Sequence, residues 1–188
     1  MINAGAYDLG KAKSGTARRV KVFVSYSHKD ERLREEVEKH LSALRRSKSI
    51  ATWNDHRISP GKEVDAQVAA FLGTSDLVLL LVSPDFMNSD YCYLREMKEA
   101  LKRHRRGDAR VIPVVLRPVD WSKTPIGKLL ALPRDGKPVT SWNKRDEALL
   151  DVAKGIRRVV EEIQAKRATS PRVRGKRTIV GVRGARTS

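Results

Sequence analysis

The sequence predicts an α/β protein built on five parallel strands in a doubly wound sheet, with helices on both faces. Short apolar runs alternate along the chain with segments whose apolar residues recur every three or four positions, the spacing of one helix face. Strands that alternate with helices pair in parallel and are joined by right-handed crossovers. Five such units occupy about 150 of the 188 residues, which is the size of one domain. This pattern favours the flavodoxin-like strand order 2-1-3-4-5.

The expected strands are recognised by their β-branched and apolar composition. The run LVLLLV at residues 77–82 is the strongest signal for a central strand. Pro113 indicates a bulge or a peripheral position for the fourth strand, because proline cannot donate to a ladder. The fifth strand reads as an edge strand. In chain order the strands are expected at residues 20–25, 50–54, 76–83, 110–117 and 138–142.

The helices are expected between these strands. In the first of them, Leu33, Val37, Leu41 and Leu44 recur at helical spacing, and Ser27 is expected as its N-cap. A short helical segment is expected to begin at Pro84, since proline suits the first helical position, and to break near residues 88–89. Residues 119–137 read as a long irregular connection. The helices are expected at residues 28–47, 63–72, 84–88, 89–106 and 146–166.

Composition limits the compartment and the organisation of the chain. A single cysteine excludes an internal disulfide and a cysteine-based zinc site, and it fits a reducing compartment. No apolar run approaches the roughly 20 residues of a membrane span, and the first 19 residues lack the hydrophobic segment of a signal peptide. We therefore expect a cytoplasmic protein without membrane contact. Its expected parts are a flexible segment at 1–19, a folded domain at 20–165 and a basic tail at 166–188.

The tail supplies +8 of the net charge of +17. Residues 166–188 carry eight lysines and arginines and no acidic residue. Such a segment is either a solvated, disordered tail or an arm that binds phosphates without sequence specificity. The tail thus leaves contact with nucleic acid or another anionic surface open.

Glu96 is the residue that a plain amphipathic helix does not explain. A helical wheel places it on the apolar side of its segment, between Cys92 and Ala100, and no basic residue three or four positions away can pair with it. Glu99, by contrast, has arginines four residues to either side. A carboxylate among apolar neighbours is costly unless the fold satisfies it. It is either a structural carboxylate or part of a site. The predicted topology brings it toward the crevice beyond the carboxyl ends of the first and third strands.

Several chemistries are not indicated. The chain has neither a G-x-x-x-x-G-K-[ST] loop nor a G-x-G-x-x-G after its first strand, so these phosphate cradles are missing. The four histidines show no metal-ligand spacing, and no acidic cluster marks the strand ends, so we expect no metal. Cys92 has no histidine near it in sequence, and core packing is favoured over a nucleophilic role.

The residues at three strand ends resemble those of a known family. The segment FVSYSHKD at residues 23–30 looks like the first signature box of Toll/interleukin-1 receptor (TIR) domains. Trp53-Asn54-Asp55, followed by Ile58-Ser59-Pro60-Gly61, is similar to the second box and the BB loop. Ser89 to Cys92, followed by Glu96, resembles the segment that holds the catalytic glutamate of NAD-cleaving members. The resemblance runs from about residue 20 to residue 163.

The resemblance implies a five-stranded parallel sheet and either of two functions. Some members hydrolyse NAD+ at the nicotinamide–ribose bond or cyclise the remaining ADP-ribose. Others are non-catalytic adaptors or effectors that act by TIR–TIR association. Glu96 favours the enzyme, although several NAD-cleaving relatives have a tryptophan where this chain has Cys92. A third class, a nuclease or nucleic-acid-dependent cyclic-nucleotide synthase, rests only on the basic charge.

For the enzyme, Glu96 is the expected catalytic residue, NAD+ is the substrate, and no cofactor is needed. The serines and the tyrosine after the first strand could instead serve loop solvation and helix capping, and Trp53 could pack in the core. The expected substrate-binding residues are Ser25, Tyr26, Ser27, Trp53, Asp55, Arg57, Lys62 and Cys92. The BB loop, with Ile58, Ser59, Pro60 and Gly61, is expected to mediate self-association, and a separate sensor or activator protein is expected to switch the domain on.

Overall fold

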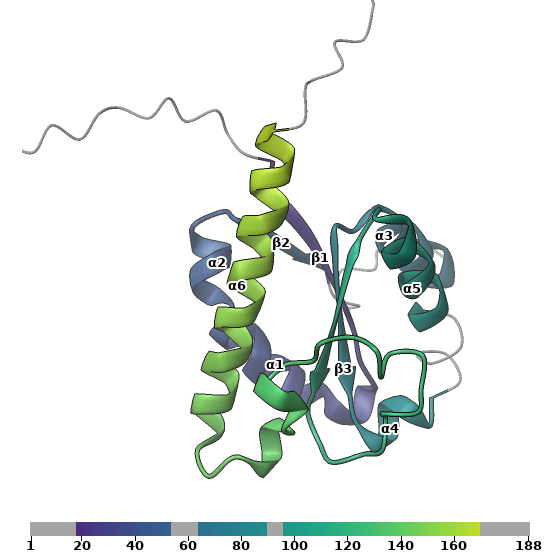
Figure 1. Cartoon of the computed structure of the whole chain (residues 1–188), viewed down its shortest axis with the longest axis vertical. Helices are drawn as coiled ribbons and strands as arrows, with labels where there is room; N and C mark the ends of the chain where they lie inside the picture. The colour runs from purple at the N-terminus through teal and green to yellow at the C-terminus, as the bar shows by residue number, and fades with distance from the viewer. Residues whose placement is uncertain (1–17, 54–63, 90–95, 170–188) are drawn as a thin grey trace, which may run out of the picture.

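The structure is a computed structural model that describes residues 18–53, 64–89 and 96–169. A parallel sheet lies between two layers of helices (Figure 1). Its described strands are β1 (Val20–Ser25), β2 (Ile50–Trp53), β3 (Leu77–Val82) and β4 (Arg110–Val115), in the order β2-β1-β3-β4. The expected order is confirmed for these four strands.

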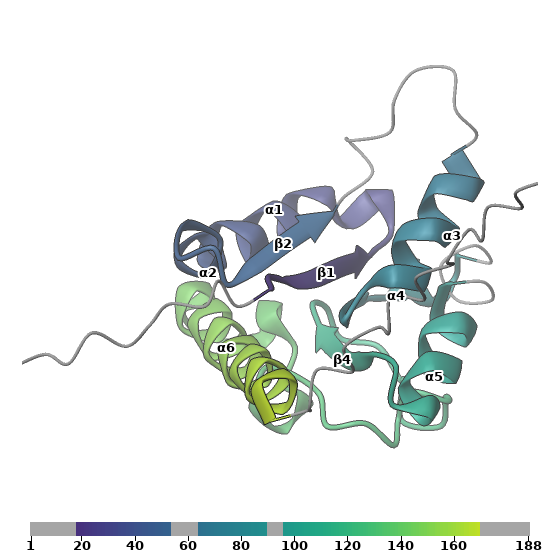
Figure 2. The ribbon, with the colours of Figure 1, turned by 90° about the horizontal axis from the view of Figure 1, so that it is seen from above.

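The two faces of the sheet are covered by different helices (Figure 2). One layer holds α1 (Glu31–His40), α2 (Ser42–Arg46) and α6 (Arg145–Thr169), and the other holds α3 (Val64–Thr74) and α5 (Met97–Arg106). The short helix α4 (Pro84–Met87) follows β3. Ser83 caps it by accepting a hydrogen bond from the backbone N–H of Phe86 at 3.0 Å, and Pro84 takes the first position as expected.

The alternation of β1 divides the core in two. Val22 and Val24 pack in the cluster under α1 and α6, whereas Phe23 packs in the cluster under α3 and α5. Successive side chains of a strand point to opposite faces, so this alternation also determines which residues at the end of β1 meet which layer. Every residue of β3 is buried, as expected for a central parallel strand.

Pro113 sits in β4 where it removes no ladder hydrogen bond. Its carbonyl accepts a hydrogen bond from the N–H of Leu132 at 2.9 Å, and the carbonyl of Leu132 accepts one from the N–H of Val115 at 2.8 Å. The backbone N–H and C=O groups of the odd-numbered residues of β4 therefore point away from β3. The missing N–H of Pro113 therefore points to the outer edge, which confirms the peripheral position of this strand among the described ones. Leu132 covers that edge and lies against Gly155 of α6, where a Cβ would come within 2.6 Å of its Cδ2.

The expected fifth strand is wrong. Residues Val139–Ser141 form a 3-10 turn, with hydrogen bonds from Ser141 to Pro138 at 2.9 Å and from Trp142 to Val139 at 3.4 Å. Val139 is fully buried, so its apolar character reflects insertion into the core. Thr140 donates a single bond to Leu116, at 3.1 Å.

The expected helix at 28–47 is interrupted. A 3-10 turn at His28–Asp30 precedes α1, and Leu41 separates α1 from α2. Ser27 takes the expected N-cap position, before the 3-10 turn, but its side chain makes no capping hydrogen bond. The backbone explains this, because the carbonyl of Ser27 accepts from the N–H of Asp30 at 2.7 Å and closes the tighter turn.

The expected flexible segment and the basic tail lie almost wholly outside the described residues. No helix of the described part of the chain is both long enough and apolar enough to cross a membrane.

Candidate functional site

Glu96 is a buried carboxylate at the carboxyl edge of the sheet. It immediately precedes α5 and is 7% exposed, next to the buried residues Met97 and Ala100 of the α3/α5 layer. The hydroxyl of Ser25, the last residue of β1, donates a hydrogen bond to Glu96 Oε2 across 71 positions of sequence. The burial that the helical wheel predicts for Glu96 is confirmed.

The fold satisfies a negative charge at this place with a hydrogen bond from the end of β1. The hydroxyl of Ser25 donates to the Glu96 carboxylate, and a bond to a charged group is stronger than one between neutral groups. The arrangement keeps an anionic oxygen in a mostly apolar layer at the edge where doubly wound sheets bind ligands.

Tyr26 and Ser27 do not join Ser25 at this point. Tyr26 is 5% exposed and belongs to the core cluster of the opposite layer, where its ring lies 5.8 Å from that of His28. Ser27 is half-buried and begins the 3-10 turn. Of the three expected substrate-binding residues after β1, the structure brings only Ser25 to Glu96.

Arg34 holds Tyr26 in the opposite layer. Its guanidinium carbon lies 5.3 Å from the centre of the tyrosine ring, and its side chain is 3% exposed. Arg34 pairs with Glu31 and, at 2.7 Å, with Glu38. Burial by itself lowers the pKa of this guanidinium, but the hydrogen bonds to Glu31 and Glu38 outweigh it and raise the pKa above its ordinary value. A charged arginine thus anchors α1 beneath the exit of β1.

A second polar cluster joins three strand ends at the same edge. Asp30, 2% exposed, accepts a hydrogen bond from the hydroxyl of Ser83 after β3, and its Oδ1 lies 3.1 Å from Nε of Arg117 after β4. This buried carboxylate ties the turn that follows β1 to the exits of β3 and β4.

Asp85 in α4 extends this cluster to the surface. It accepts a hydrogen bond from Arg117 and pairs with Lys29 at 3.1 Å. The Arg117 hydrogen bond, followed by that of Lys29, holds the pKa of the Asp85 carboxyl below its ordinary value of 3.8. Arg117 therefore bridges two carboxylates, one buried and one half-buried.

The sequence did not predict that Asp30, Ser83, Asp85 and Arg117 form one group. A usable signal was present, because the carboxyl ends of parallel strands meet at one edge and polar residues follow β1, β3 and β4 within five positions. Their pairing depends on side-chain direction, which no local pattern shows.

The other expected site residues fall mainly outside the description. Trp53 is the last residue of β2, paired with Phe23 of β1, so its backbone reaches the same edge. Asp55, Arg57, Lys62, Cys92 and the BB-loop residues Ile58, Ser59, Pro60 and Gly61 lie outside the described residues. Within residues 18–53, 64–89 and 96–169, no group of three or more histidine, cysteine, aspartate or glutamate side chains is placed to hold a metal ion.

A comparison with family models identifies the family of the chain. Residues 22–151 match the family model described as the TIR domain, and the chain belongs to that family. The family resemblance carried by the three strand-end motifs is thereby confirmed.

One curated relative is "Uncharacterized protein y4lF" of Sinorhizobium fredii (strain NBRC 101917 / NGR234). It is 49% identical over 150 residues, which are 80% of this chain and 46% of the relative. The chain thus spans about half the length of the curated relative that it matches.

A solved structure of low identity shares the fold. The TIR domain of the Toll-related receptor TRR-2 from Hydra magnipapillata superimposes with a TM-score of 0.51 at 20% identity, over 74% of this chain and 97% of that one. The TIR domains of the activated Roq1 resistosome, solved with the pathogen effector XopQ, give a TM-score of 0.44 at 21% identity, over 84% and 90% of the two chains.

Proposed function

We propose that this TIR domain cleaves NAD+ at the bond between nicotinamide and ribose, with Glu96 as the catalytic residue. The observation that carries the proposal is the buried Glu96 carboxylate, hydrogen-bonded by Ser25 at the carboxyl edge of the sheet. The products are nicotinamide and either ADP-ribose or a cyclic isomer of it. We place the activity in the cytoplasm, in antiphage defence or cell-suicide signalling.

Cleavage of this bond needs only one carboxylate from the protein. When the bond between ribose C1′ and the nicotinamide nitrogen breaks, its electron pair leaves with nicotinamide, which departs as a neutral molecule. The ribose is left with oxocarbenium character, and the leaving group needs no protonation. Water then adds to C1′ and releases a proton, or a nitrogen of the adenine adds instead and closes a ring.

Glu96 would act on the positive charge that develops on the ribose. An anionic oxygen in a partly dry layer stabilises such charge more than it would in water, as in glycoside hydrolysis. Ser25 would hold the carboxylate in position by the hydrogen bond it already donates. Substrate contacts from Trp53, Asp55, Arg57, Lys62 and Cys92 remain part of the proposal.

The test is nicotinamide release by purified protein at high concentration. Glu96→Gln should reduce the rate at least about 100-fold, since the amide keeps the size of the side chain and loses its charge. Glu99→Gln, in the first turn of α5, is the matched control. Glu99 is half-exposed and lies 3.8 Å from Lys102. Arg103, four residues after Glu99, instead donates to the carbonyl of Asp108 at 3.3 Å and to that of Leu72.

The control should retain full activity. If Glu96→Gln releases nicotinamide as fast as the unmodified protein, Glu96 is not catalytic. If the unmodified protein releases none at any concentration while it still self-associates, the domain is a non-catalytic adaptor. Chromatography of the second product separates hydrolysis from cyclisation.

A further inference from the structure

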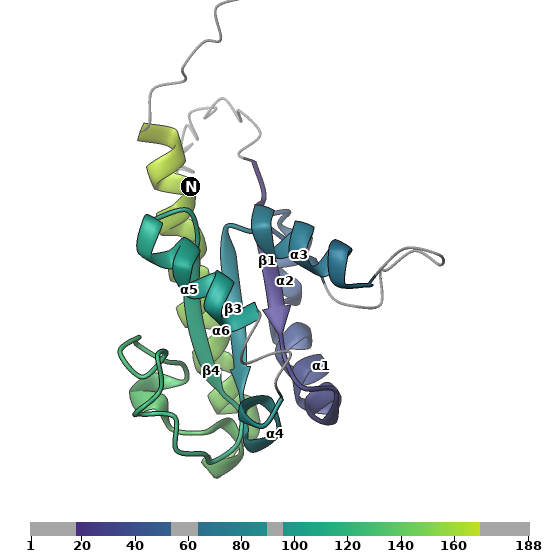
Figure 3. The ribbon, with the colours of Figure 1, turned by 90° about the vertical axis from the view of Figure 1, so that its right-hand side faces the viewer.

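The edge of the sheet opposite Glu96 gathers positive charge. The strands begin there, and α2, α5 and α6 end there. Figure 3 shows the end of α6 near the start of β1 at one end of the molecule, and α4 at the other end. We call six of the exposed cations of this region the basic edge: Arg19, Lys21, Arg46, Lys48, Arg105 and Arg106.

None of the six cations of the basic edge pairs with a carboxylate in the part of the chain that the structure describes. The acids nearby already have partners, since Asp76 pairs with Arg167 and Glu162 with Arg110 at 3.1 Å. Asp108 is a further acid at this edge, but one more carboxylate against six cations leaves the local charge strongly positive.

Helix dipoles explain the positions of only some of these cations. Arg46 lies in the last turn of α2, and Arg105 and Arg106 lie in the last turn of α5, where the negative end of the helix dipole stabilises a cation. Lys21 belongs to β1, and Lys48 belongs to the turn before β2, so they have no such role.

Lys48 also sits in an unfavourable backbone conformation. Its φ is 56°, in the left-handed region that glycine adopts most readily, and it follows α2 in the position where helices usually carry glycine. Among the described residues, neither the backbone nor an ion pair explains a lysine at this position.

We propose that the basic edge binds the phosphate backbone of a nucleic acid, without sequence specificity and independently of Glu96. Concentrated like charge destabilises a folded protein unless an anion neutralises it. The charges extend across the sheet from α2 to α5, which suits a polymer of regularly spaced phosphates better than a single small anion.

An anionic membrane is a poorer match for this surface. The strength of binding to a membrane surface depends on the apolar area that is buried there as well as on positive charge. The three described large apolar residues that are well exposed, Phe71, Leu130 and Leu150, lie on α3, on the connection after β4 and on α6, and form no such band.

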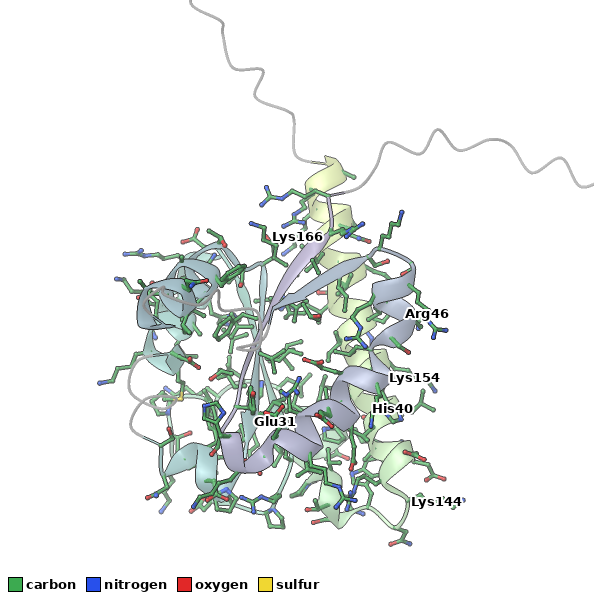
Figure 4. The ribbon with its side chains drawn as sticks, turned by 180° about the vertical axis from the view of Figure 1, so that it is seen from behind. Glu31, His40, Arg46, Lys144, Lys154 and Lys166 are labelled. Carbon is green, nitrogen blue, oxygen red and sulfur yellow. The ribbon has the colours of Figure 1, made fainter. Side chains whose placement is uncertain are left out.

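The test compares two triple variants of the full chain that lose equal charge. The edge variant is Lys48→Gln/Arg105→Gln/Arg106→Gln. The control is Lys123→Gln/Lys144→Gln/Lys154→Gln, three exposed lysines away from this edge, of which Lys144 and Lys154 are labelled in Figure 4. Fluorescence anisotropy with a labelled DNA duplex of about 30 base pairs measures the affinity between about 50 and about 200 mM salt.

We expect the unmodified protein to bind with a Kd of about 1–100 μM at physiological salt, and more weakly as salt rises. The edge variant should lose at least about tenfold in affinity, with a salt slope shallower by up to about 3. The control should bind as the unmodified protein does. Circular dichroism checks that each variant folds, and Lys21→Gln/Arg46→Gln replaces an edge variant that does not.

Three outcomes would overturn the proposal. The first is no binding of duplex by the unmodified protein at low salt. The second is an equal loss in both variants, which would assign binding to net charge rather than to this edge. The third is binding of phosphatidylserine vesicles or polyglutamate in preference to the duplex, which would assign the edge to a membrane or to an acidic protein.

Discussion

Ser25 and Ser27 stand two positions apart at the exit of β1 and have different surroundings. Ser25 ends the strand on the face covered by α5, is 1% exposed, and donates to Glu96. Ser27 begins a turn, and its side chain makes no capping bond. The same residue type thus satisfies a buried carboxylate at one position and faces partly into solvent at the other.

Ser25→Ala should therefore destabilise the protein, and Ser27→Ala should not. Removing a hydrogen bond to a buried charged group lowers the free energy of unfolding by about 1.5–3 kcal/mol. Ser27→Ala should change it by no more than about 0.5 kcal/mol. Urea unfolding measures both, and an equal effect of the two substitutions would contradict the placement of Ser25 beside Glu96.

Asp85 makes stability depend on pH in the acid range. Its pKa is lowered in the folded state, chiefly by the hydrogen bond from Arg117, so it contributes stability above its ordinary pKa of 3.8. That contribution is lost as the pH falls through the lowered value. In urea unfolding from about pH 6 to about pH 2, Asp85→Asn should lose less stability on acidification than the unmodified protein. Parallel curves for the two proteins would show that the pair with Arg117 does not form.

At the scale of the elements, substitutions in the turn between α2 and β2 can change the charge of Lys48 and its backbone strain separately. Lys48→Gly relieves the left-handed conformation and should raise the free energy of unfolding by up to about 1 kcal/mol. Lys48→Gln removes the same charge and keeps the strain, so its stability should match that of the unmodified protein. Urea unfolding of both variants checks this, and a loss of stability in Lys48→Gly would contradict it.

The predicted strands and helices succeeded where the pattern was long or strongly apolar. The strand at Val20–Ser25 and the buried character of Leu77–Val82 follow from composition, because a strand covered on both faces needs apolar side chains on both. Residues Val139–Ser141 have the same local character and form a turn instead. Strand formation there requires a partner edge, and Leu132 already occupies the outer edge of β4.

For the whole molecule, we predict that the proposed NAD+ cleavage depends on assembly. The BB loop lies outside the described residues, and its contact with a neighbouring domain stays a prediction. Specific activity should rise with protein concentration if association completes the site. Since the net charge of +17 repels identical chains, added salt at moderate ionic strength should favour association. A flat activity profile from nanomolar to tens of micromolar protein would contradict this prediction.

The sequence by itself determined the α/β class, the order of four strands, the family and the burial of Glu96. These properties depend on the local periodicity of apolar residues and on short sequence motifs. Only the tertiary structure decided that Ser25, and not Tyr26 or Ser27, meets Glu96, and that Asp30 joins Ser83 and Arg117. Parallel crossovers bring residues 53 to 87 positions apart to one edge, and the facing of each side chain there depends on where its strand ends and its turn begins.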